Sequence, residues 1–260
     1  MLFDIHHLFF CYQEKKIIDD LSLSLEPGKF YGVIGPNGCG KTTFPDLISK
    51  QRSPAASGEI IYKGKPISRY SKKALSKEIA LVPQNFYINF PFTAKEIVMM
   101  GRYPYIPRFS APSSADLAYV EKIMDATGTS EFEHRLITEL SWGERQRVVF
   151  ARALVQDTPV LILDEATSNF DIRHTIRMLN IVTQGAREAG KTVIAVFQDI
   201  NMAAIWCDDL IFMKNGKIIA HGPTKTVLDA DIIRTVFDVD AKVCFEAYAG
   251  AKQVVFRSEP

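Results

Sequence analysis

Apolar and polar residues follow two different rhythms along this chain of 260 residues. Residues 21–25 alternate with a period of two, which predicts a half-buried strand. Other strand-like runs are almost wholly apolar and rich in β-branched residues, which is typical of strands buried on both faces of a parallel sheet. These runs are residues 30–34, 160–163 and 192–197. Helical spacing predicts three long helices, at residues 116–127, 144–155 and 172–189. Strands that alternate with helices predict an α/β protein.

A glycine-rich stretch, residues 35–43, follows the buried strand at residues 30–34 and precedes a helical pattern. This order of strand, loop and helix is that of a phosphate-binding P-loop. Its glycines let the backbone wrap a phosphate, and successive N–H groups form an anion nest. We expect Lys41 to reach the β- and γ-phosphates and the Thr42 hydroxyl to bind Mg²⁺. The predicted nucleotide-binding residues here are Gly35, Pro36, Asn37, Gly38, Cys39, Gly40, Lys41, Thr42 and Thr43.

Two residues in and after this loop are unusual. Cys39 sits among amides that point inward, so we expect its thiolate to be stabilised. Pro45 falls just past the predicted first turn of the helix, where a proline costs roughly 3 kcal/mol unless the helix starts late or kinks. We therefore expect a distortion near Pro45.

Composition and charge narrow the possibilities. The formal net charge is +1, so nothing indicates a nucleic-acid partner. No apolar run approaches the ~20 residues that span a bilayer, and the N-terminus lacks the pattern of a signal peptide. The four cysteines are far apart, with no C-x-x-C pair, which predicts reduced thiols in the cytosol.

Polar residues follow two of the predicted strands. Asp164 and Glu165 end the run at residues 160–163, and Gln84 ends a shorter run. Open α/β sheets bind ligands at the carboxyl ends of their strands. We expect Asp164 to hold Mg²⁺ and Glu165 to polarise a water that attacks the γ-phosphate. The alternative is a pair of solvated carboxylates at a strand end. Tyr12, in an early strand, is either a core residue or a stacking partner for adenine.

Ser141 and Glu144 form a capping box at the start of a predicted helix. A capping box alone is structural. This helix start also offers a hydroxyl and the amide of Gly143, which suit a phosphate group. The phosphate can belong to a second molecule, because the helix lies in a separate, largely helical segment.

Taken in order, these motifs resemble the nucleotide-binding subunit of an ABC transporter over almost the whole chain. Residues 35–43 match Walker A, Gln84 the Q-loop, residues 140–146 the signature, residues 160–165 Walker B, residues 168–171 (Ser168-Asn169-Phe170-Asp171) the D-loop and residues 197–199 the H-loop. The resemblance implies a P-loop NTPase (RecA-like) core of mostly parallel sheet, with an antiparallel β subdomain and an inserted α-helical lobe. The implied domains are residues 1–84 and 157–222 for the core, 85–156 for the helical signature lobe, and 223–260 for a C-terminal appendage.

The resemblance also implies roles for single residues. Tyr12 is implied as the adenine stack, and Glu165 with Gln198 as catalytic residues. Mg²⁺ contacts are implied for Thr42, Gln84 and Asp164. A head-to-tail dimer with a second copy is implied, in which signature residues meet the ATP of the partner subunit. These residues are Ser141, Gly143 and Glu144, with Asp171 in the D-loop.

Membrane partners follow from the same resemblance. Two transmembrane permease subunits are implied, together with an extracytoplasmic substrate-binding protein that acts indirectly. The chain itself is implied to be peripheral, at the cytoplasmic face of the cell membrane. More narrowly, residues 100–105 are similar to importers of ferric siderophores, haem or cobalamin, and residues 199–201 and 221–260 support this.

The chain departs from the family pattern at four positions. Gln198 replaces the H-loop histidine, and its amide can donate a hydrogen bond but cannot carry a charge or shuttle a proton. Trp142 replaces the first glycine of the signature, and Phe170 replaces a D-loop leucine. Pro45 strains the helix behind Lys41. A slowed enzyme, a degenerate subunit and a chain that keeps only the fold all stay open. Our hypothesis is that ATP binding survives and hydrolysis is impaired.

Two other functions are compatible with the motifs. One is a non-hydrolysing, ATP-gated binding subunit, which slow turnover with tight ATP binding would favour. The other is a soluble ABC-type ATPase that acts on DNA or ribosomes. The near-zero net charge, the lack of a coiled-coil insertion and the segment at residues 100–105 argue against the latter.

Overall fold

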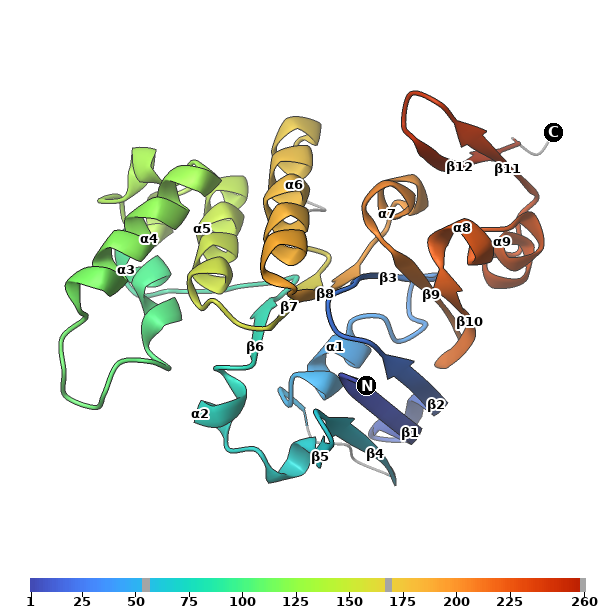
Figure 1. Cartoon of the computed structure of the whole chain (residues 1–260), viewed down its shortest axis with the longest axis horizontal. Helices are drawn as coiled ribbons and strands as arrows, with labels where there is room; N and C mark the ends of the chain where they lie inside the picture. The colour runs from blue at the N-terminus through green and yellow to red at the C-terminus, as the bar shows by residue number, and fades with distance from the viewer. Residues whose placement is uncertain (53–56, 167–169, 258–260) are drawn as a thin grey trace. The chain divides into compact units, whose positions relative to one another are not determined.

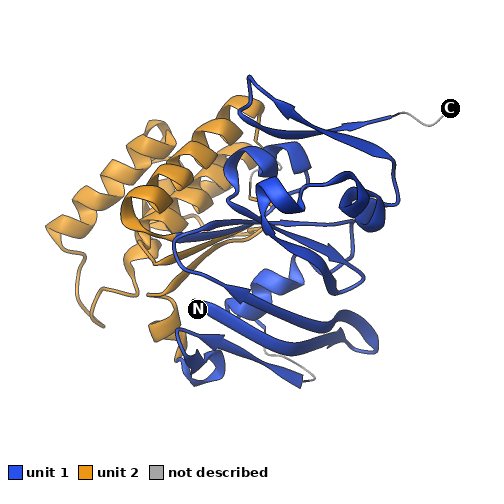
Figure 2. Ribbon diagram, turned by 45° about the vertical axis from the view of Figure 1, so that its right-hand side comes forward, with its two compact units in different colours: residues 1–70, 192–260 blue, residues 71–191 orange. Residues whose placement is uncertain are grey.

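A computed structural model describes residues 1–52, 57–166 and 170–257 (Figure 1). Ser168 and Asn169 of the predicted D-loop lie outside the described residues. The chain separates into two compact units (Figure 2). The first comprises Met1–Tyr70 and Thr192–Pro260, and the second comprises Ser71–Lys191.

The first unit contains an antiparallel sheet with the strand order β2-β1-β4-β5. The strands are β1 (Phe3–Tyr12), β2 (Lys15–Leu25), β4 (Ser57–Tyr62) and β5 (Lys65–Pro66). Along the last residues of β2, Leu21, Leu23 and Leu25 are buried and the serines between them are more exposed. The period of two therefore predicted this strand correctly, because one face of the sheet packs inward.

The first unit also contains strands that pair in parallel. Strand β3 (Phe30–Ile34) lies between β8 (Thr192–Val196) and β9 (Asp209–Lys214) and is parallel to both. All residues of β3 and β8 are buried, as their apolar runs predict. The predicted hairpin is β9 with β10 (Lys217–Pro223), and its turn residues Asn215 and Gly216 both have positive φ. That turn geometry matches the right-handed twist of the strands.

Short helices and a second hairpin complete the first unit. They are η1 (Ile67–Arg69), α1 (Thr43–Ile48), α7 (Ile200–Trp206), α8 (Thr224–Val227), α9 (Ala230–Phe237), β11 (Ala241–Glu246) and β12 (Ala251–Phe256). Asn201 attaches this hairpin to α7: its Oδ1 accepts from the Val254 amide at 2.7 Å, and its Nδ2 donates to the Val254 carbonyl at 3.1 Å.

The second unit joins a parallel strand pair to a helical lobe. Its strands are β6 (Ile79–Val82) and β7 (Val160–Asp164), which pair in parallel. Its helices are α2 (Lys72–Leu75), α3 (Ala94–Met99), η2 (Met100–Arg102), α4 (Ser114–Thr127), η3 (Ser130–Phe132), η4 (Ile137–Glu139), α5 (Trp142–Val155) and α6 (Ile172–Ala189). The apolar faces of α3, α4 and α5 meet at Val98, Val120 and Val148, which are fully buried. The helical spacing thus predicted α6 to the residue and α4 and α5 within two residues.

The segment at residues 100–105 is attached to α5. A Cβ on Gly101 would lie 2.3 Å from the Arg152 carbonyl oxygen, so only glycine lets the two backbones approach. Arg102 donates to Val155 O at 3.0 Å and to Asp116 at 2.9 Å, and stacks on Tyr105. The segment therefore has a structural role in holding the end of α5.

The predicted α/β class, with parallel strand pairs, an antiparallel sheet and a helical lobe, is confirmed. The four predicted domain ranges stay a prediction. Within the described residues, none of the helices combines the length and the apolar character that a bilayer crossing requires.

Candidate functional site

The P-loop connects the carboxyl end of β3 to α1 and depends on glycines. Gly38 and Gly40 have φ of 79° and 106°, a conformation that side chains with a Cβ rarely adopt. A Cβ on Gly35 would lie 2.1 Å from the Met213 carbonyl oxygen. These three positions set the path of the loop, and Gly35 leaves no room for any side chain.

Lys41 is folded into this loop. Its side chain is 5% exposed, and its Nζ donates to the carbonyl oxygens of Gly35 at 2.8 Å and Pro36 at 3.0 Å. Within the described part of the chain, no carboxylate forms an ion pair with this ammonium group. Its charge is available to an anion seated in the loop, which is what its predicted role requires.

The predicted distortion at Pro45 takes the form of a late helix start. Helix α1 begins at Thr43, so Pro45 occupies the third position of the helix, where no intrahelical partner for an N–H exists. The next amide, that of Asp46, is 3.5 Å from the Thr42 carbonyl, a long bond. Thr42 stays exposed at the N-cap, and its side chain makes no capping hydrogen bond.

The prediction of a stabilised Cys39 thiolate is wrong. The side chain is 3% exposed, and burial raises the pKa of this thiol. The backbone of Cys39 also takes part in the loop: its amide donates to Pro36 O at 3.3 Å, and its carbonyl accepts from Gly216. Desolvation of the buried thiolate outweighs the stabilisation that Lys41 and the loop amides offer it.

Tyr12 lies at the end of β1 and is 38% exposed. The guanidinium carbon of Arg52 lies 4.9 Å from the centroid of its ring, and Arg52 Nε donates to Asp46 at 2.8 Å. One face of the ring therefore already carries a cation that is anchored to α1. The predicted adenine stack stays a prediction, and sequence reasoning missed Arg52 because it lies far from Tyr12 along the chain.

Gln198 lies two residues beyond β8 and is exposed. Strands β3 and β8 are parallel, with Val33 opposite Val196. Gln198 and the P-loop consequently leave the sheet at the same edge, the carboxyl edge at which such sheets bind ligands.

The second unit brings two of the predicted residues into direct contact. Gln84 Nε2 donates to Glu165 Oε2 at 2.6 Å. Both residues follow parallel strands, β6 and β7, in which Val82 lies opposite Leu163. Glu165 is buried and has φ of 48°, which is uncommon for a residue with a long side chain and costs about 1–3 kcal/mol. Asp164, the last residue of β7, is also buried.

The predicted capping box at the start of α5 is present. Ser141 Oγ accepts from the Glu144 amide at 3.4 Å, and Glu144 Oε2 accepts from the Ser141 amide at 2.7 Å. Hydrogen bonds from Ser141 lower the pKa of Glu144. Trp142 is 36% exposed beside Gly143, so its indole ring is accessible at the helix start. Asp171 caps α6 by accepting from the His174 amide at 2.8 Å.

Arg152 of α5 lies behind the predicted Q-loop. Its guanidinium carbon is 4.3 Å from the centroid of the Phe86 ring, two residues beyond Gln84. Burial lowers the pKa of Arg152 to about 10. No sequence pattern predicted this stack, because it joins two segments that are distant along the chain.

The family model described as ABC transporter matches residues 18–168 of this chain. The chain belongs to the ABC transporter family. In the terms of this family it is an ATP-binding cassette of the ABC ATPase class, as its motifs predicted.

Named relatives and a solved structure agree with this assignment. The chain is 39% identical over 239 residues to the cobalamin import ATP-binding protein BtuD of Halobacterium salinarum, which covers 92% of this chain and 59% of that protein. It is 34% identical over 244 residues to the ferric enterobactin transport ATP-binding protein FepC of Escherichia coli, covering 94% and 90%. A solved inward-facing ABC transporter described as of the metal-chelate type matches with a TM-score of 0.82 at 25% identity, covering 99% of this chain and 97% of that one. This chain therefore spans about three fifths of the length of the cobalamin relative.

Proposed function

We propose that this chain binds ATP with Mg²⁺ and hydrolyses it, as the energising subunit of an importer for an iron chelate, haem or cobalamin. The observation that carries the proposal is the P-loop, in which backbone geometry and the buried Lys41 ammonium form an anion site before any nucleotide arrives. The substrate class comes from the names of the relatives and from the segment at residues 100–105.

The residues divide the work as follows. Loop amides and Lys41 hold the β- and γ-phosphates, and Glu165 orients the attacking water as general base. In the described structure, Gln84 donates to one oxygen of Glu165 and so orients the carboxylate that would polarise the water. Thr42, Gln84 and Asp164 offer a hydroxyl, an amide and a carboxylate oxygen, the hard donors that suit Mg²⁺. Bound Mg²⁺ would neutralise charge on the phosphates.

A second copy of the chain supplies the other half of each ATP site. The exposed start of α5, with Ser141, Gly143 and Glu144, suits the γ-phosphate held by a partner subunit, and Asp171 accompanies it. Trp142 is exposed at this helix start, and its bulky indole ring hinders close contact between the two subunits. Gln198 cannot carry the charge of the family histidine. Both substitutions support impaired hydrolysis with retained ATP binding.

The lobe that follows Gln84 suits a membrane partner. Tyr87, Phe90 and Phe109 are exposed large apolar residues. A cavity of about 370 Å³ lies in the same lobe, lined by Met99, Tyr103, Ile106, Pro107, Ser110 and Pro112. This surface would bind two transmembrane permease subunits. The chain would then be a peripheral protein at the cytoplasmic face of the membrane. An extracytoplasmic substrate-binding protein acts through them, and no nucleic acid is a partner.

The test compares ATP binding and steady-state ATP hydrolysis in this chain and in the double variant Gln198→His with Trp142→Gly. We expect similar ATP affinity and a rise in turnover of about a hundredfold, the low end of what a positioned acid–base group contributes. Gln184→His, on the exposed face of α6, is the matched control. Equal turnover in the two chains would refute the impairment. Tight ATP binding with no turnover in either would favour a non-hydrolysing, ATP-gated subunit.

A further inference from the structure

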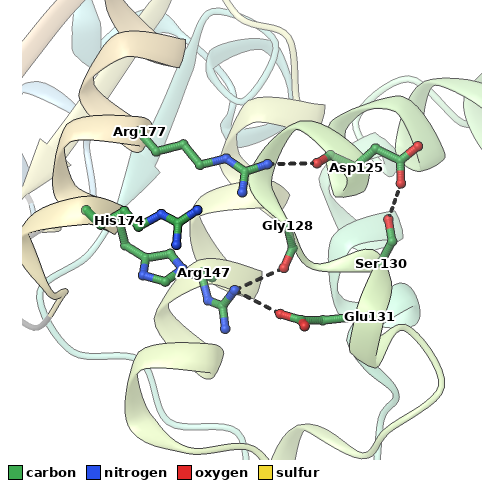
Figure 3. A pocket seen from close by; sticks show the side chains of 8 residues that line it. Asp125, Gly128, Ser130, Glu131, Arg147, His174 and Arg177 are labelled. Atoms are coloured by element: carbon green, nitrogen blue, oxygen red, sulfur yellow. Dashed lines mark hydrogen bonds and ion pairs between the residues drawn. The ribbon is translucent and has the colours of Figure 1, made fainter.

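A cationic cavity of about 340 Å³ lies in the second unit, and none of the residues that line it is assigned to ATP above. Arg147 of α5 lines it together with Arg173, His174 and Arg177 of α6 (Figure 3). On the opposite side lies the segment where α4 ends and η3 begins, which includes Asp125 and Glu131.

Two of the three arginines hold the end of α4. Arg147 Nη1 donates to the Gly128 carbonyl at 3.0 Å and to Glu131 at 3.1 Å. Arg177 donates to the carbonyls of Ala126 and Asp125 at 3.1 and 3.2 Å. Each guanidinium has five N–H donors in a planar fork, so these contacts leave donors unused on both side chains.

Arg173 has no such structural task. Among the described residues, none forms a hydrogen bond or an ion pair with its guanidinium group. The Asp125 carboxylate accepts from Ser130 at 2.5 Å, and Glu131 pairs with Arg147 at 3.1 Å. Among the residues that line the cavity, three arginines therefore face two carboxylates, and a third carboxylate, that of Asp171, lies beside the cavity and contacts His174 Nδ1 at 2.8 Å.

We propose that this cavity binds a phosphate group, carried as inorganic phosphate or as the monoester of a small metabolite. Planar guanidinium groups bind phosphate oxygens in pairs, and several in one cavity favour a doubly charged anion over chloride. The volume is at the low end for small-molecule sites and leaves room for a short organic body. The site goes beyond the proposed ATPase function, because it uses none of the P-loop residues.

Because of where the cavity lies, a phosphate bound there would affect how the chain binds ATP. Helix α5 begins after Ser141 of the signature, and α6 begins after Asp171 of the D-loop. An anion between Arg147 and Arg173 bridges the second turn of α5 and the first turn of α6. If its affinity differs between the open and the ATP-closed dimer, the anion shifts the affinity of the chain for ATP by the same factor through linkage.

The test measures phosphate binding by titration calorimetry on the full chain. Mg²⁺ and a non-hydrolysable ATP analogue are present at saturation, so that the P-loop is filled. Inorganic phosphate is one arm and glycerol 3-phosphate the other. Arg173→Gln removes the unpaired cation, and Arg187→Gln, exposed in the last turn of the same helix, removes an equal charge outside the cavity.

We expect saturable binding in at least one arm, weakened about tenfold or more by Arg173→Gln and unchanged by Arg187→Gln. Arg173→Lys should keep part of the affinity, because it keeps the charge but loses the planar fork. Tighter binding of the ester identifies a metabolite, and tighter binding of phosphate identifies the free ion. Absence of saturable binding in both arms, or equal losses in the two glutamine variants, overturns the proposal. Equal melting temperatures of the variants establish that the loss is local.

Discussion

The P-loop and the Gln84–Glu165 pair serve the same proposed reaction but are held in place by different forces. The P-loop is a backbone structure, set by glycines at positions where a side chain is strained or has no room. The Gln84–Glu165 pair is a side-chain structure, held by one hydrogen bond of 2.6 Å and a strained backbone at Glu165. A backbone site keeps its shape without a ligand, whereas a side-chain pair changes with each competitor for its hydrogen bonds. Substitutions in the first should damage folding, and substitutions in the second should damage turnover.

The largest effect is expected at Glu165. Glu165→Gln keeps the shape of the side chain but removes the proposed general base, so turnover should fall about 10²–10³-fold, within the usual range for such a group. ATP affinity should change little, because the P-loop is untouched. Steady-state hydrolysis and binding of a fluorescent ATP analogue measure the two effects separately. Glu14→Gln, in the exposed turn between β1 and β2, is the control. Hydrolysis at the rate of the unmodified chain would exclude Glu165 as the base.

Gly35 should show the opposite behaviour. In Gly35→Ala the new Cβ meets a backbone carbonyl 2.1 Å away, which cannot move without disturbing β9, so we expect a loss of about 3 kcal/mol in unfolding free energy. Gly38→Ala is the matched control, since its Cβ would meet nothing within 4 Å and only its φ of 79° is unfavourable, at about 1 kcal/mol. Urea unfolding of both variants measures the difference. Equal losses of unfolding free energy in the two variants would mean that the lack of space beside Gly35 does not determine the conformation of the loop.

The same contrast explains what the sequence could predict. The P-loop, the capping box of Ser141 with Glu144 and the bounds of α6 are local, so a few neighbouring residues suffice to predict them. The sequence predicted that Gln84 and Glu165 each follow a strand, but their contact depends on the pairing of β6 with β7, which the sequence did not predict. The burial of Cys39 and the stacks of Arg52 on Tyr12 and Arg152 on Phe86 depend on how distant segments pack. No periodicity or spacing contains that information.

A smaller effect is expected where Arg152 stacks on Phe86. Arg152→Lys keeps the charge but loses the planar contact, and Phe86→Leu removes the ring. Each should lower the unfolding free energy by about 1 kcal/mol, the usual range of a partly desolvated cation–π pair. Because both variants remove the same contact, the double variant should lose little more than either alone. Urea unfolding of the four chains in this cycle gives the coupling. Strictly additive losses would show that the stack does not hold the Q-loop segment.

The smallest effect concerns Cys39 and tests whether the P-loop is closed without nucleotide. Burial raises the pKa of its thiol, so at any given pH less of it is thiolate than for an exposed cysteine. Alkylation by N-ethylmaleimide should therefore be slower at the buried Cys39 than at the half-buried Cys11, and the rate at Cys39 should rise with pH. Peptide mapping by mass spectrometry resolves the two sites. Bound ATP should slow the alkylation of Cys39 further, because the thiol can react only when the P-loop opens. A Cys39 that reacts as fast as Cys11 would mean that the loop opens freely, and the contrast between a rigid backbone site and an adaptable side-chain pair would not hold.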